Sequence, residues 1–169
     1  ERDVGQLQRL LATPLPRIAL VLGKAAGAAT RALVQAVVLL VVIAIAGIGL
    51  RWRVVGVAGA LVLLALGTGV FACLSMTIAS LVKERERFMG IGQLVMMPLF
   101  FASSALYPLS VMPGWLHVVA SVNPLTYEVE GLRGFLLGGG HPWLDLLITL
   151  GWLIVLATAA TRAYPKAIL

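Results

Sequence analysis

Charged residues are scarce in this chain. They make up 12% of its 169 residues, whereas hydrophobic residues make up 60%. A soluble domain of this size carries about twice that charged fraction. Together with a mean hydropathy of +1.01, this scarcity predicts an all-α protein that crosses a membrane several times. The net charge of +6 does not indicate nucleic-acid binding, because in a membrane protein the placement of positive charge sets the topology.

Groups that carry out chemistry are equally few. The single cysteine, Cys73, excludes an internal disulfide and a thiol metal cluster, and we interpret it as a small buried hydrophobe. His117 lies one turn from Ser121, but no third partner completes a hydrolase site. We therefore expect no catalytic residue, no metal site and no enzymatic activity in this chain.

Four apolar segments each have about 20 residues, the length that a helix needs to cross roughly 30 Å of hydrocarbon. Only helices satisfy every backbone group at that depth in segments of this length. The segments predicted to span the membrane are 27–49, 54–82, 88–106 and 143–161.

Lysine and arginine predict the orientation of these spans. One set of connecting segments is much richer in them than the other, which places that set in the cytoplasm. The richer set holds Arg2, Arg9, Arg17, Lys24, Lys83, Arg85, Arg87, Arg162 and Lys166, and the poorer set holds Arg51, Arg53 and Arg133. Both ends of the chain are thus predicted to be cytoplasmic, and residues 107–142 to lie outside the cell membrane.

The first 24 residues form a cytoplasmic segment in this scheme. Val4, Leu7, Leu10 and Leu11 recur at helical spacing and make one apolar stripe. Pro14 ends that helix, and a new one is predicted to start near Arg17. The short helix either lies on the bilayer surface or docks on a cytoplasmic partner. The proline corner favours docking, because it holds the helix at a fixed angle.

Polar side chains inside the spans suggest a substrate path. We expect it to involve Arg31 and Gln35 of the first span and Gln93 and Ser103 of the third. An ionised residue at such depth usually faces a bundle interior or a water-filled cavity. The alternative for Arg31 is snorkelling to the headgroups.

The external segment predicts two short helices. The first covers about 114–122, and the second has Asn123 as its N-cap and Pro124 at its first helical position. It runs to about Leu137, too short to span. Glu130 and Arg133, three residues apart, can pair. The pattern predicts a hairpin that dips part-way into the outer leaflet; the alternative is a packing cap without a gating role.

Two stretches carry a resemblance to a known family. "PLFFASSALYPLSVMPGWLHVVASVNPLTYEVEGLRGFLLGG", residues 98–139, has a Pro-Leu-Phe span end, a Met-Pro-x-Trp-Leu helix, then Asn-Pro-Leu-Thr-Tyr, an acidic residue and Leu-Arg. "ERDVGQLQRLLATPLPRIALVLGK" opens the chain. Both resemble the permease subunits of type-2 ABC exporters, the group that includes daunorubicin-resistance permeases and nodulation and polysaccharide exporters.

The resemblance implies roles for individual residues. Residues 1–13 would form the coupling helix that seats on an ATPase subunit, and 113–137 a re-entrant gate near the axis of a permease homodimer or heterodimer. The implied coupling residues are Val4, Gly5, Leu7, Leu10, Leu11 and Pro14. The implied gate residues are Pro113, Trp115, Asn123, Pro124, Tyr127, Glu130 and Arg133, with Glu130 on the family's acidic position.

The resemblance also implies an energy source on another chain. "VLGKAAG" contains the pair Gly23-Lys24, but Ile18 stands where a P-loop has its first glycine and Ala25 where it has Ser/Thr. ATP and Mg²⁺ are therefore expected on a partner subunit. The family has six spans, so two are expected ahead of residue 1. The expected cargo is hydrophobic or amphiphilic, as in drug efflux, and lipid-linked or polysaccharide cargo is the alternative. A structural or channel-like membrane protein without an ATPase is the alternative from another class. Richness in Ala, Val and Gly suggests a bacterial source.

Overall fold

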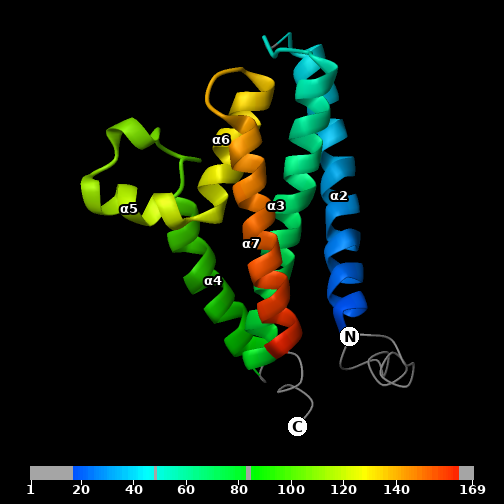
Figure 1. The fold of residues 1–169 in the computed structure, drawn as a ribbon, viewed down its shortest axis with the longest axis vertical. Helices are drawn as coiled ribbons and strands as arrows, with labels where there is room; N and C mark the ends of the chain where they lie inside the picture. The colour runs from blue at the N-terminus through cyan, green and yellow to red at the C-terminus, as the bar shows by residue number, and fades with distance from the viewer. Residues whose placement is uncertain (1–16, 48, 83–84, 164–169) are drawn as a thin grey trace.

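The computed structural model describes residues 17–47, 49–82 and 85–163. The regular structure in this part of the chain is all helix, with no strand, and turns or loops connect the helices. The helices are α2 (Arg17–Ile45), α3 (Val54–Leu81), α4 (Arg85–Phe101), the 3-10 turn η2 (Leu109–Val111), α5 (Gly114–Val122), α6 (Pro124–Leu136) and α7 (Pro142–Ala163). Figure 1 shows α2, α3 and α7 side by side, α4 splaying away from them, and the short α5 lying across the end of α4. The predicted coupling segment, residues 1–13 with Pro14, lies outside the described residues.

Three of the described helices are long and apolar enough to cross a membrane. They are α3, α7 and the part of α2 from Val21 to Ile45. The predicted spans 54–82 and 143–161 match α3 and α7 closely. The end of the first predicted span, at residue 49, is wrong. The helix stops at Ile45 because the chain turns at Gly47, whose φ of 68° is one that glycine adopts easily.

The predicted third span, 88–106, is also placed too far along the chain. Helix α4 has 17 residues, about 25 Å of helix, and ends at Phe101. The Ser103 hydroxyl donates to the Phe100 carbonyl oxygen at 2.7 Å and accepts from the Ala105 N–H at 3.2 Å. A serine that bonds to nearby backbone in this way competes with the helical pattern. Residues 102–106 therefore form a turn and not the end of a span.

Helix α3 lies at the centre of the bundle. It packs against α2, α6 and α7, and makes fewer contacts with α4. One buried cluster joins Val21, Cys73 and Ala160, from α2, α3 and α7. A second joins Ala60 and Leu63 of α3 to Phe135 of α6. Cys73 is thus the buried hydrophobe that the sequence predicts.

Candidate functional site

Asn123 joins the start of α6 to the end of α4. Its Oδ1 atom accepts a hydrogen bond from the Leu125 N–H at 3.0 Å, which caps α6. Its Nδ2 atom donates to the carbonyl oxygens of Leu99, at 2.6 Å, and Ala102, at 3.1 Å. The predicted N-cap is confirmed. The structure adds that the same amide, only 2% exposed, satisfies carbonyls that the end of α4 leaves without helical partners.

Small polar side chains surround this amide. Ser103 and Ser104 are fully buried in the turn after α4. The Ser104 hydroxyl donates to the Thr126 carbonyl oxygen of α6 at 3.4 Å. The Thr126 hydroxyl is itself buried and has no hydrogen-bond partner among the described residues. The junction of α4 and α6 is therefore a buried polar contact between two helices.

Helix α6 runs antiparallel along α3 on a stripe of small residues. The Phe135 ring lies on Gly59, where an added Cβ would come within 2.5 Å of ring atom Cε1. Gly131 lies against Leu63, and the Glu128 carboxyl lies directly on Gly67. From Val54 to Gly67 the distance along α3 is about 20 Å. The N-terminal end of α6 thus lies well down the side of α3, about half-way along it.

The other end of α6 is held by the loop between α2 and α3. The Arg51 N–H donates to the Leu136 carbonyl oxygen at 2.8 Å, and the Arg51 guanidinium lies against Gly138. A positive charge at this end of a helix is favourable, because the helix dipole is negative there. The rings of Phe135 and Trp143 meet edge to face, with centroids 5.1 Å apart. Both ends of α6 are therefore fixed to neighbouring helices.

Glu128 is the buried acidic residue of this site, and sequence reasoning missed it. Its side chain is 7% exposed, and burial of a carboxyl without a partner favours its neutral form. Glu130, which the sequence analysis singled out, forms its predicted ion pair with Arg133 at 3.0 Å, and both side chains are more than a third exposed. The glycines of α3 at 59 and 67 were the signal that could have found Glu128.

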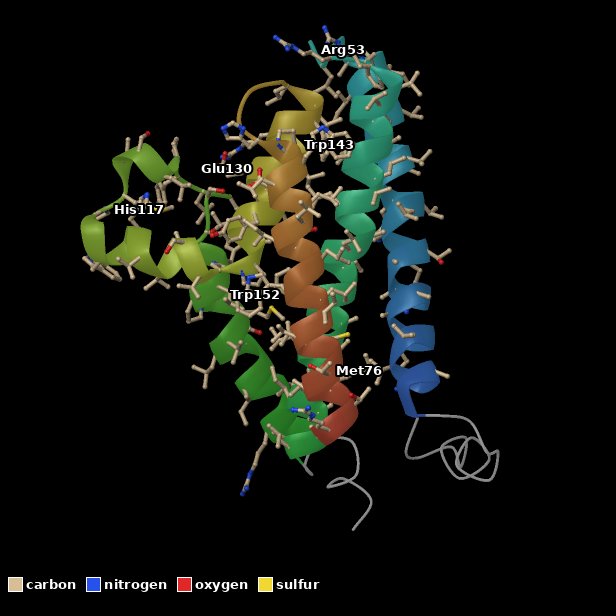
Figure 2. All side chains as sticks on the ribbon, in the orientation of Figure 1. Arg53, Met76, His117, Glu130, Trp143 and Trp152 are labelled. Atoms are coloured by element: carbon tan, nitrogen blue, oxygen red, sulfur yellow. The ribbon has the colours of Figure 1, made fainter. Side chains whose placement is uncertain are left out.

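The remaining gate residues lie on both sides of Asn123. Pro113 caps α5, and Trp115 on α5 is 71% exposed. The Tyr127 hydroxyl donates to the Ser121 carbonyl oxygen and so fastens α5 to α6. Pro124 is buried at the start of α6. Figure 2 shows His117 on α5, away from the three long helices.

The candidate path residues do not line one cavity within this chain. Arg31 on α2 is exposed, and its Nε atom donates to the Gly27 carbonyl oxygen at 3.4 Å. Gln35 lies in an apolar groove of about 290 Å³ between α2, α3 and α6. Gln93 is exposed on α4, and Ser103 is buried at the α4–α6 junction. Helices α3 and α7 lie between α2 and α4 (Figure 1), so the α2 pair is separated from Gln93.

Comparison with known proteins gives a family match and several relatives. The family described as "ABC-2 type transporter" matches residues 1–137. The chain is 28% identical to a "Putative transport permease ycf38" of Porphyra purpurea over 90% of this chain and 52% of that protein. It is 28% identical to a "Probable doxorubicin resistance ABC transporter permease protein DrrC" of Mycobacterium tuberculosis over 99% of this chain and 61% of that protein. It is 34% identical to "Nodulation protein J" of Rhizobium meliloti over 70% of this chain and 44% of that protein.

The chain spans about half the length of the curated relatives it matches. No solved structure matches it.

Proposed function

This chain belongs to the ABC-2 type transporter family, and on that premise we propose that it is the membrane-spanning permease part of an ATP-driven exporter. The observation that carries the proposal is the family match over residues 1–137. ATP and Mg²⁺ would bind a separate ATP-binding subunit, and the permease would work as a homodimer or heterodimer. Its place would be the cell membrane, with both ends of the described chain at the cytoplasmic face.

The described contacts support a route for force. A motion that enters at residues 1–13 would reach α2, which packs on α3, and α3 packs on α6. Through the Asn123 amide, α6 would carry the motion to the end of α4. Coupling of this kind needs a contiguous set of packed or hydrogen-bonded elements, and these helices supply one.

In this proposal α4 is a fourth, shorter span and α5 and α6 form the re-entrant hairpin. The position of Asn123, beside the end of α4 and about half-way along α3, supports a hairpin whose bend lies below the outer surface. Polar backbone at such depth is tolerated only where protein or water satisfies it. The Asn123 bonds to the Leu99 and Ala102 carbonyls meet that requirement.

The proposed cargo is a hydrophobic or amphiphilic compound that leaves the cell. Few charges lie on the described helices, and a relative carries a doxorubicin-resistance name. A relative with a nodulation name supports lipid-linked or polysaccharide cargo as the second candidate.

The test is transport by the full-length permease with its ATP-binding subunit in inside-out vesicles. We expect ATP to drive accumulation of an amphiphilic fluorescent compound, and a hydrolysis-deficient ATP-binding subunit to abolish it. Accumulation of a lipid-linked saccharide, and not of the fluorescent compound, would favour the second candidate. Passage of solute at equal rates with and without ATP would favour a channel-like protein and contradict the proposal.

A further inference from the structure

Glu128 has a position that the proposed transport function does not explain. Among the side chains that the structure describes, it is the only buried acidic one. Its carboxyl group lies directly on Gly67, where any larger residue of α3 would collide with it. Within residues 17–163 it forms neither a hydrogen bond nor an ion pair with another described residue. A carboxylate ion in such surroundings would be costly, whereas a neutral carboxyl is tolerated.

No described neighbour supplies a compensating positive charge. On α3 the only titratable side chain is Cys73, which lies in the other buried cluster. On α7 the side chain of Asp145 lies beside Gly131, one turn from Glu128, and carries the same sign of charge.

The charged groups on α6 and its nearer neighbours do not offset Glu128 either. Arg133 is paired with Glu130, and the Tyr127 hydroxyl bonds to the Ser121 carbonyl oxygen. His117 is exposed on α5, and Arg87 and Arg162 lie at the far ends of α4 and α7. Burial without a partner therefore favours the protonated form of the Glu128 carboxyl.

We propose that Glu128 is a proton-binding site that fastens the N-terminal half of α6 to α3. In the protonated state the neutral carboxyl packs on Gly67, as the structure shows its position. When the O–H bond breaks, the proton leaves to water and the electron pair stays on the carboxylate. That ion needs water or a cation, so α6 must move away from Gly67. This inference goes beyond the transport proposal, because the site requires neither ATP nor cargo.

The link through Asn123 gives such a release a wider effect. Asn123 lies five residues before Glu128 and holds the end of α4 through two hydrogen bonds. A shift of the first turns of α6 would therefore move the end of α4 as well. Proton exchange at Glu128 would act on the two helices that meet at the candidate site.

The test uses dicyclohexylcarbodiimide on the full-length permease in its membrane, with mass spectrometry of the labelled peptide as a function of pH. This apolar reagent reacts with protonated carboxyl groups. The carboxyl O–H adds across one C=N bond, and migration of the acyl group to nitrogen gives a stable N-acylurea with no leaving group. We expect labelling at Glu128 to persist above pH 5, where an exposed glutamate is already ionised, and to fall only at higher pH.

Three variants make the result decisive. Glu128→Gln should remove the label, and Glu130→Gln, at an exposed position, should leave both label and midpoint unchanged. Gly67→Ala places a Cβ on the carboxyl, so it should push Glu128 toward water and weaken proton binding about 100-fold, toward the pKa of a free glutamate. A wild-type midpoint below pH 5, or an unchanged midpoint in Gly67→Ala, would overturn the proposal. Gly67→Ala and Glu130→Gln decide the question even if Glu128→Gln fails to assemble.

Discussion

At the scale of single residues, Asn123 is central to the junction between α4 and α6. One buried side-chain amide caps α6 through Oδ1 and binds two carbonyls of the α4 end through Nδ2. Buried carbonyls that lose their donors are expensive, so the amide stabilises a junction that apolar packing alone would not hold. The neighbouring Ser103 and Ser104 do not supply a second donor to Leu99 or Ala102.

Replacement of Asn123 by alanine should lower stability by about 2–4 kcal/mol, from a lost cap and two unpaired buried carbonyls. Asn123→Asp keeps the capping oxygen but turns an anion toward those carbonyls, so it should be at least as unstable. Thermal unfolding of the purified permease checks both variants, with Ser121→Ala as the exposed control. If Asn123→Asp were as stable as the wild type, the hydrogen bonds from Asn123 to the end of α4 would not contribute to stability.

Glu128 should make stability depend on pH. Because burial without a partner favours its protonated form in the folded protein, its contribution is complete below the pKa of a free glutamate, about 4.3, and is lost as the pH rises above that value. Denaturant unfolding at pH 5 and pH 8 should show a steeper loss for the wild type than for Glu128→Gln. Equal losses in the two proteins would contradict this prediction.

Glu130 offers the contrast of an exposed acid on the same helix. Its ion pair with Arg133 spans three residues on a half-exposed face, and such pairs contribute less than about 0.5 kcal/mol. We expect Glu130→Ala to leave folding intact and to alter export in the vesicle assay. A variant that failed to assemble would instead support a packing-cap role for the hairpin.

At the scale of helices, the contact of α6 with α3 depends on glycine. Gly59 and Gly67 let an aromatic ring and a carboxyl approach the α3 backbone closely, and Gly131 does the same for Leu63 in the other direction. Close approach at small residues is a common way for membrane helices to associate. The face of α3 that contacts α6 is therefore defined by glycines, which have no side chain.

Gly59→Ala should destabilise the protein by about 1–3 kcal/mol, because its Cβ would meet the Phe135 ring. Gly151→Ala on α7 is the matched control: nothing lies within 4 Å of its added Cβ, and alanine is the better helix former by up to about 1 kcal/mol. Unfolding midpoints of the two variants should move in opposite directions. Similar losses at both positions would argue against close packing at Gly59.

Sequence alone predicted α3, α5 and α6 well, because their ends carry strong local signals such as Asn123-Pro124. The predicted end of the third span, at residue 106, was wrong, because hydrogen bonds of the Ser103 hydroxyl to nearby backbone end the helix after Phe101. Sequence reasoning singled out Glu130, whose role stays a prediction, and did not single out Glu128. Leu132 and Leu136 of α6 pack on the cluster that contains Phe135. Local sequence could not show that Gly59 and Gly67 of α3 contact α6, because that contact depends on how the two helices pack.

At the scale of the whole molecule, the proposed permease couples a cytoplasmic segment, residues 1–13, to the outer hairpin of α5 and α6. Leu7 and Leu11 of that segment lie outside the described part of the chain, so their role stays a prediction. If both become Asp, co-purification of the ATP-binding subunit should fall while membrane insertion stays normal. Pull-down from solubilised membranes measures the first and membrane fractionation the second. Unchanged co-purification would mean that this segment does not seat the partner.

In the proposed topology the hairpin of α5 and α6 faces the outside, and the start of α4 faces the cytoplasm. Labelling of single cysteines with a membrane-impermeant thiol reagent tests it most directly, at Trp115→Cys and Arg87→Cys in a Cys73→Ser background. We predict that intact cells label position 115 and that position 87 is labelled only after permeabilisation. Labelling of both positions from the same side of the membrane would contradict the account.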